Sequence, residues 1–151
     1  MKILVTGDRG YIGATLVPML RKKYEVIGYD SGYFSENLLE QFDEDYIKIT
    51  KDIRDISRED LEEVDGIIHL AGLSNDPLGE FSPKLTEEIN YSGTIRLAEM
   101  AKDIGVSRFV YASSQSMYGV SDTSNELDED DSEKNPVTAY AIAKWNAEQQ
   151  L

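Results

Sequence analysis

The sequence predicts an α/β fold in which a parallel sheet is covered by helices on both faces. Short apolar runs alternate with longer helix-like segments along the chain, as in consecutive strand–helix–strand units. The runs are almost continuously apolar, which suits strands buried on both faces. With 151 residues and 40% apolar content, the chain is expected to form one domain, residues 1–151.

The first strand–helix–strand unit occupies the N-terminal 29 residues. Lys2–Thr6 is an apolar run that ends in glycines, Tyr11–Lys23 is predicted to be a helix, and Glu25–Tyr29 is predicted to be the second strand. Pro18 lies inside the predicted helix. Because proline removes a backbone donor, we expect it to bend this helix near Ala14.

The alternation continues to the end of the chain. The remaining predicted elements are strands at Tyr46–Ile49, Gly66–Leu70 and Arg108–Ala112, a long helix over Leu85–Asp103, and a last helix that begins near Thr138.

Composition excludes several classes of site. The chain has no cysteine and a single histidine, His69, so it has no disulfide, thiolate metal site or multi-histidine cluster. We expect His69 to be a packed core residue and not a proton shuttle, because it ends an apolar run. The net charge of -14 opposes binding to nucleic acid or anionic membranes. No apolar run reaches the length of a membrane span and no signal peptide is evident, which predicts a soluble cytoplasmic protein.

An anionic ligand must therefore be held by local groups, and the segment "TGDRGYIG" offers them. Gly7, Gly10 and Gly13 lie between the first strand and the first helix. Such a turn lets the backbone approach a pyrophosphate, while the helix N-terminus presents free N–H groups. The spacing is G-x-x-G-x-x-G and not the usual G-x-G-x-x-G, so a tight structural turn is the alternative.

Asp30 ends the second strand, 17 residues after Gly13. A carboxylate at this place can accept hydrogen bonds from an adenosine ribose and would repel a 2′-phosphate, which favours NAD over NADP. Arg9, inside the glycine turn, argues for NADP instead, but we give Asp30 the greater weight. The aromatic residues beside Asp30 either cover an adenine or form the wall of a turn; they are Tyr29, Tyr33 and Phe34.

A tyrosine and a lysine four residues apart occur in "TAYAIAKW". On a helix, Tyr140 and Lys144 lie on one face, within reach of a single reacting group. A tyrosine phenol ordinarily has a pKa near 10, so its use as a base near neutral pH needs a nearby positive charge. Taken alone, the pair is more typical of an ordinary helix turn.

Seven motifs in order resemble those of the extended short-chain dehydrogenase/reductase family, the NAD-dependent nucleotide-sugar epimerases and dehydratases. They are "TGDRGYIG", Asp30, "KDIRD", "HLAGLS", "INYSGT", "YASSQSMYG" and "NPVTAYAIAK". The resemblance covers the whole chain. It implies a Rossmann-like, doubly wound parallel sheet of about five strands in the order 3-2-1-4-5, with NAD as cofactor.

The resemblance also implies the site residues. The cofactor would contact Gly7, Gly10, Tyr11, Ile12, Gly13, Asp30, Ser31, Asp52, Ile53, Leu70, Ala71, Gly72, Asn90, Tyr140 and Lys144. The catalytic residues would be Ser114, Tyr140 and Lys144. In that scheme Tyr140 takes the hydroxyl proton, Lys144 bonds the nicotinamide ribose, and Ser114 bonds the substrate oxygen.

The residues after Ser114 help to choose a reaction. Family 4,6-dehydratases carry an Asp-Glu pair there, and decarboxylases usually carry a glutamate at the second position. This chain has Gln115 and Ser116, which do not titrate usefully. Epimerisation or simple oxidation and reduction of a nucleotide sugar is therefore predicted. A non-catalytic NAD-binding module is the alternative.

Family members are about twice as long as this chain, which ends at Leu151 within the helix of Tyr140. We therefore expect the NAD-binding domain to be incomplete and the substrate-binding region to be absent. The resemblance also implies a possible homodimer through the helix over Leu85–Asp103 and the helix that begins near Thr138.

Two loops allow more than one interpretation. Ser74, Asn75 and Asp76, in Leu73–Phe81, either touch substrate or cap a turn. The acidic run Asn125–Pro136 is expected to be a solvated loop, with substrate contact as the minority interpretation.

Overall fold

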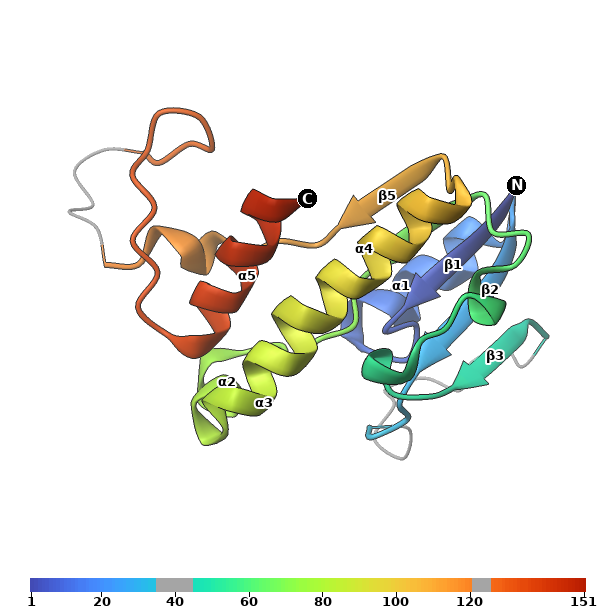
Figure 1. Cartoon of the computed structure of the whole chain (residues 1–151), viewed down its shortest axis with the longest axis horizontal. Coiled ribbons are helices and arrows are strands. Elements are labelled where there is room, and N and C mark those ends of the chain that lie inside the picture. Colours follow the sequence, from blue (N-terminus) through green and yellow to red (C-terminus); the bar gives the residue numbers. More distant parts are fainter. Residues whose placement is uncertain (35–44, 121–125) are drawn as a thin grey trace.

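A five-stranded parallel sheet forms the centre of the molecule (Figure 1). The computed structural model describes residues 1–34, 45–120 and 126–151. The strands are β1 Lys2–Thr6, β2 Glu25–Asp30, β3 Ile47–Thr50, β4 Gly66–His69 and β5 Arg108–Tyr111. Their spatial order is β3-β2-β1-β4-β5, and every neighbouring pair is parallel. The predicted fold class and strand order are confirmed.

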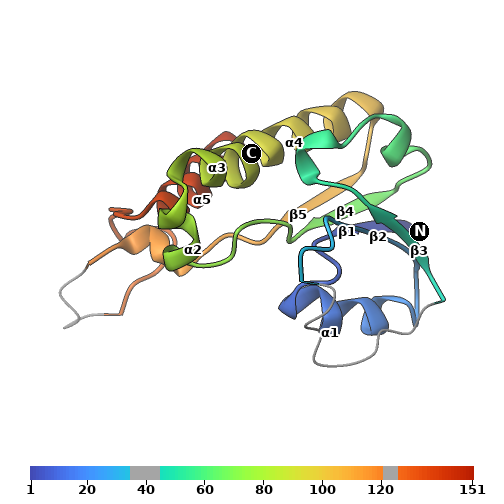
Figure 2. The same ribbon diagram turned by 90° about the horizontal axis from the view of Figure 1, so that it is seen from below.

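Helices lie on both sides of this sheet (Figure 2). Helix α1, Tyr11–Leu20, covers one face, and α4, Gly93–Ile104, covers the other. The remaining helices are α2 Asp76–Phe81, α3 Pro83–Glu87 and α5 Ala139–Gln150, with short turns at η2 Ile53–Asp55, η3 Glu59–Leu61, η4 Glu88–Ser92 and η5 Gln115–Tyr118. In the described part of the chain, no helix is long and apolar enough to cross a membrane.

The apolar core is divided by the sheet into two layers. Leu4 of β1 belongs to the larger layer, which includes Leu97 of α4. Ile3 and Val5, on the opposite face of the same strand, pack with Val17 of α1. Successive side chains of a strand point to opposite faces, so a continuous apolar run serves both layers. This explains why the strands are uninterrupted apolar segments in the sequence.

The first helix is shorter than predicted. It ends at Leu20, not at Lys23, and continues through Pro18. Pro18 removes one backbone hydrogen bond and lies in the last turn, so only two residues of the helix follow it. The amides of Lys23 and Tyr24 both bond to the carbonyl of Leu20 and close the turn into β2.

The long helix runs from Pro83 to Ile104, close to the predicted Leu85–Asp103. It includes one π turn, η4, that spans Glu88–Ser92. A π turn inserts one extra residue into a helix and often accompanies a functional site. Here Asn90 lies in the middle of that turn and is 1% exposed. The helix ends at Ile104 and is capped by Gly105, whose φ of 83° is left-handed.

Candidate cofactor and catalytic site

A cavity of about 720 Å³ opens at the carboxyl ends of β1, β2 and β4. This is where open α/β sheets bind ligands. Twelve predicted cofactor residues line it: Gly7, Gly10, Tyr11, Ile12, Gly13, Asp30, Ser31, Asp52, Ile53, Leu70, Ala71 and Gly72. Asn90, Tyr140 and Lys144 are not among its lining residues. Residues predicted from separate motifs therefore form one wall.

The glycine turn forms a cradle that has no room for side chains. A Cβ atom on Gly13 would lie 2.3 Å from the carbonyl oxygen of Gly7, and one on Gly7 would lie 2.8 Å from the amide of Ala71. Gly7 also has a φ of 71°. Helix α1 begins after Gly10, which has no side chain to cap it, and the first N–H groups of a helix have no acceptor within the helix. The cradle and these donors fit the pyrophosphate of a dinucleotide.

Asp8 belongs to the glycine turn but does not line the cavity. Its fully buried carboxylate accepts a 2.7 Å hydrogen bond from the Tyr46 hydroxyl. A Cβ on Gly28 would lie 2.1 Å from an Asp8 carboxylate oxygen, so Gly28 makes the space that this side chain fills. Burial raises the pKa of Asp8. The nearest acidic group in the turn thus faces away from the proposed phosphate position.

Asp30 lies at the end of β2 and lines the cavity. One carboxylate oxygen accepts a 2.7 Å hydrogen bond from the amide of Gly32. Arg9 donates to the carbonyl of Asp30 at 3.0 Å and to the Thr50 hydroxyl at 2.8 Å. Arg9 therefore connects the ends of β2 and β3. Its guanidinium is used in these structural bonds, which agrees with giving Asp30 more weight than Arg9 in the choice between NAD and NADP.

Asp52 is held by an arginine that the sequence analysis did not single out. Arg54 binds both carboxylate oxygens of Asp52, at 3.0 Å from Nε and 2.8 Å from Nη2. These bonds lower the pKa of Asp52. Tyr33 adds a 3.3 Å bond to the same carboxylate. Arg54 lies two residues after Asp52 in "KDIRD", and this short separation is the feature of the sequence that could have indicated the pair.

The three aromatic residues near Asp30 have different surroundings. Tyr29 also borders the cavity but is fully buried, and its hydroxyl donates to the carbonyl of Asp52 at 3.1 Å, so it packs as a core residue. Tyr33 and Phe34 are 65% and 60% exposed and line the cavity. These two remain available to cover an adenine.

Asn90 supports the cavity from behind. Its side chain accepts a 2.8 Å hydrogen bond from the amide of Leu73 and donates a 3.0 Å bond to the carbonyl of the same residue. Leu73 lines the cavity, together with its neighbours from Leu70 to Ser74. The structure shows Asn90 fixing the backbone of a cavity-lining loop, and its contact with the cofactor stays a prediction.

His69 is a buried core residue, as predicted, and both of its ring nitrogens are hydrogen-bonded. Nδ1 lies 2.6 Å from the Thr6 hydroxyl and Nε2 lies 2.8 Å from the Thr94 hydroxyl. Thr94 donates to the carbonyl of Asn90, so it accepts the Nε2 proton of a neutral imidazole. Burial lowers the pKa of His69 to about 3, with a smaller effect from Lys144. The residue joins β1 to α4 beneath the cavity loop.

The catalytic candidates lie beyond β5. Lys144 is 5% exposed, and its ammonium donates to the carbonyl of Ala112 at 2.8 Å and lies 4.6 Å from the ring centre of Tyr111. Burial lowers the pKa of Lys144 to about 8. Ser114 precedes η5 and caps it by accepting from the amide of Ser116. Tyr140 is half-buried in the first turn of α5, which contacts η5.

The fold agrees with that of a known family. The chain matches the model of the NAD dependent epimerase/dehydratase family over residues 3–151. The chain belongs to this family. Membership confirms the prediction of NAD as the cofactor and the resemblance on which the site residues rest.

Individual relatives support the same assignment. UDP-glucose 4-epimerase of Rhizobium meliloti (strain 1021) is 32% identical over 157 residues, which cover 99% of this chain and 45% of the relative. MoeE5, solved in complex with UDP-glucose and NAD, shares 29% identity with a TM-score of 0.84 over 99% of this chain and 48% of its own. UDP-glucose 4-epimerase of Thermotoga maritima, solved with UDP-glucose, shares 27% identity with a TM-score of 0.85 over 99% and 49%. This member of the family thus spans about half the length of these relatives.

Helix α2 is an element that the sequence analysis did not predict. Asn75 caps it by accepting from the amide of Leu78 at 2.9 Å, and Pro77 lies in its first turn. This agrees with the interpretation in which Asn75 and its neighbours cap a turn, and the combination of Asn cap and early proline was the signal for a helix. Ser74 lines the cavity.

The described part of the acidic run, residues 126–136, is a largely exposed loop, while Asn125 lies outside the described residues.

Proposed function

We propose that this chain binds NAD for an enzyme that epimerises a nucleotide sugar through a transient keto intermediate. The main support for this proposal is that the glycine cradle and Asp30 line the same cavity. The chain that forms this cavity belongs to an NAD-dependent epimerase/dehydratase family. In this proposal the cradle and the α1 N-terminus hold the pyrophosphate, and Asp30 accepts hydrogen bonds from the adenosine ribose.

The proposed chemistry is a reversible oxidation of a sugar carbinol. NAD, when held in the cavity, would supply the hydride acceptor for this oxidation and the hydride donor for its reversal. The Tyr140 oxygen takes the hydroxyl proton as the C–H and O–H bonds break and the carbonyl forms, and it gives the proton back in the reverse step. Return of the hydride to the opposite face inverts the carbon.

Lys144 and Ser114 support this proton transfer in the proposal. The positive charge of Lys144, one turn after Tyr140 on α5, favours the phenolate form of the tyrosine. The Ala112 carbonyl and the Tyr111 ring hold its ammonium group. Ser114 would donate to the reacting oxygen, and its present bond to the Gln115 side chain, at 3.2 Å, must then be exchanged.

The neighbours of Ser114 favour epimerisation over elimination. Gln115 offers an amide and Ser116 a hydroxyl, so neither can serve as the additional acid or base that loss of water requires. A nucleotide sugar is the proposed substrate because both structures compared above were solved with UDP-glucose.

The test begins with calorimetric titration of the 151-residue chain with NAD and NADP in parallel. We expect selective binding of NAD. The whole protein that carries these residues is then mixed with NAD and a panel of nucleotide sugars, and reduction of NAD and inversion of the sugar are followed. We expect Tyr140→Phe to lower turnover by at least about 100-fold, with NAD affinity within about threefold of wild type.

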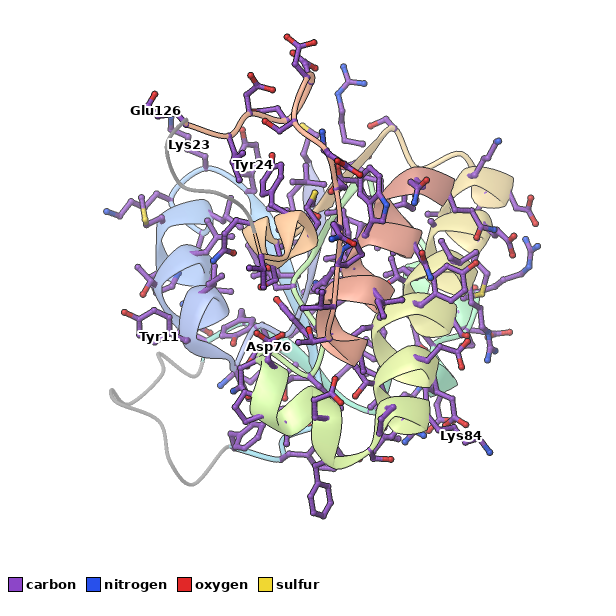
Figure 3. All side chains as sticks on the ribbon, turned by 90° about the vertical axis from the view of Figure 1, so that its left-hand side faces the viewer. Tyr11, Lys23, Tyr24, Asp76, Lys84 and Glu126 are labelled. Atoms are coloured by element: carbon purple, nitrogen blue, oxygen red, sulfur yellow. The ribbon has the colours of Figure 1, made fainter. Side chains whose placement is uncertain are left out.

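Tyr24→Phe is the matched control, because Tyr24 lies beyond the end of α1 and is not among the residues that line the cavity (Figure 3). Equal turnover of Tyr140→Phe and wild type would refute the assigned base. Selective NAD binding with no turnover on any sugar would instead favour the non-catalytic binding module.

The homodimer through α4 and α5 also stays a proposal, which a monomeric mass in sedimentation would refute.

A further inference from the structure

Helix α2 connects the cofactor cavity to the helix that carries Tyr140. It follows closely after Ser74, the last cavity-lining residue of the loop that begins at Leu70. Its far end is fixed to the long helix, because the hydroxyl of Thr86 donates to the carbonyl of Gly79 at 2.8 Å. The helix is therefore anchored at both ends and offers a rigid surface to α5.

Two carboxylates of α2 bind the first turn of α5. The Thr138 hydroxyl donates to Asp76 at 2.6 Å and accepts from the amide of Ala141 at 3.1 Å. Glu80 accepts from the amide of Ala139 at 2.6 Å. Both contacts join residues that are far apart in the sequence. Figure 3 shows Asp76 at the start of α2, where that helix meets α5.

These bonds belong to a strong class. Amides at a helix N-terminus lack acceptors within the helix, and a carboxylate near that end is also favoured by the helix dipole. Hydrogen bonds to an ionised group are shorter and stronger than neutral ones. Asp76 and Glu80 therefore fix where α5 begins.

The backbone of α2 also lies against Tyr140 itself. A Cβ atom on Gly79 would be 3.0 Å from the Cβ of Tyr140 and 3.3 Å from its amide nitrogen. Gly79 is buried, so its lack of a side chain is what permits this approach. The position of Tyr140 is thus set by α2 in two ways, through hydrogen bonds to the start of its helix and through direct contact.

We propose that α2 acts as a latch in which Asp76 and Glu80 are positioning residues for Tyr140. This rests on the proposed function, in which Tyr140 is the base. The two carboxylates do not line the cavity; they hold the N-terminus of α5 at a fixed distance from the cavity loop. Because small displacements of a reacting group slow proton transfer strongly, releasing the latch lowers the rate of the chemical step more than it weakens NAD binding.

Paired variants test the latch. Glu80→Ala and Thr138→Val remove the acceptor and the hydroxyl, while Glu80→Gln and Thr138→Ser keep a group that can make the same bond. Glu87→Ala, on the exposed surface of α3, is the control for loss of a surface carboxylate. In the whole protein we expect the first two variants to lower kcat about 10- to 100-fold, with the NAD dissociation constant within about threefold. The conservative pair should restore most of kcat.

A second readout uses NMR on the 151-residue chain and does not depend on turnover. We expect the amide of Ala139 to exchange faster, by about tenfold or more, in Glu80→Ala, because it loses its acceptor. The amide of Ala141 should do the same in Thr138→Val. The ring resonances of Tyr140 should shift in both variants and remain unchanged in Glu87→Ala.

The two readouts separate the possible failures. Wild-type kcat in Glu80→Ala and Thr138→Val, or unchanged Ala139 exchange and unchanged Tyr140 resonances, would overturn the latch. A wild-type protein with no turnover on any nucleotide sugar would overturn the proposed function, and the exchange and ring data would still decide whether α2 positions Tyr140.

Discussion

The two halves of the proposed site are held by different kinds of structure. The cofactor wall lies on strand ends and on the turns that leave them, so the sheet itself fixes its shape. Tyr140 and Lys144 lie on α5, beyond the last described strand of the sheet, and are fixed by side-chain contacts to α2 and to Ala112. We infer that cofactor binding depends on backbone geometry, whereas the placement of the base depends on a few side chains.

The largest expected effect comes from disturbing the backbone of the cofactor half. In Gly13→Ala the new methyl group would lie 2.3 Å from the carbonyl of Gly7, so the cradle must open. We expect NAD affinity to fall by about 100-fold or more in calorimetric titration, because the donors of the cradle are displaced. Overpacking of this kind also costs about 1–3 kcal/mol of folding stability.

Gly105→Ala controls for the strain of a substituted glycine. Gly105 has a φ of 83°, but no described atom lies within 4 Å of the place that a Cβ would take. This variant should lose about 1 kcal/mol of stability through its left-handed backbone while binding NAD like wild type. If Gly13→Ala also bound NAD like wild type, backbone geometry would not be what defines the cofactor half.

A smaller effect should follow from a change of charge on the same wall. Asp30→Asn keeps the shape of the side chain and removes the charge that we propose favours NAD over NADP. A hydrogen bond to a charged group contributes about 1.5–3 kcal/mol, so we expect NAD affinity to fall about 10- to 100-fold. Affinity for NADP should rise relative to NAD, as measured by parallel titrations.

Asp130→Asn makes the same chemical change in the exposed loop after η5. It should leave both affinities unchanged. An Asp30→Asn variant that retained the wild-type preference would show that another residue selects the cofactor, with Arg9 the first candidate because it bonds to the carbonyl of Asp30.

The cofactor half could be predicted because its signals are local. Gly7, Gly10 and Gly13 occupy one turn, and Asp30 ends the next strand, so motif and position in the fold coincide. The strands could be predicted equally well, since burial on both faces leaves an apolar run in the sequence. The differences lie at element ends, as at Leu20, where a proline lies in the last turn.

The sequence indicates the residues proposed for the catalytic half but not the contacts that hold them. Tyr140 and Lys144 were proposed from their spacing and from the resemblance, yet nothing near them in the sequence indicates Asp76 or Glu80. These partners meet α5 only after the chain has passed through the long helix and β5. Asn90 illustrates the same limit, because the motif identified the residue while its bonds to Leu73 depend on the π turn around it.

The smallest predicted effect concerns His69, which lies between the halves. In the folded protein its pKa is about 3, against about 6.5 in an unfolded chain. Above the unfolded-state pKa both states are neutral and the full stabilisation is present. As the pH falls below that value the unfolded state takes up a proton that the folded state refuses, so stability is lost progressively toward a pH of about 3.

Urea unfolding at about pH 7.5 and about pH 5.5 measures this loss. The wild-type chain should lose about 1.4 kcal/mol more than His69→Gln between the two values, because glutamine cannot titrate. His69→Gln will be less stable at both values, since the bonds to Thr6 and Thr94 are altered, so only the difference between the two pH values is informative. Equal losses would mean that His69 takes up a proton in the folded state. The imidazole that joins β1 to α4 would then contribute nothing to the acid sensitivity of the fold.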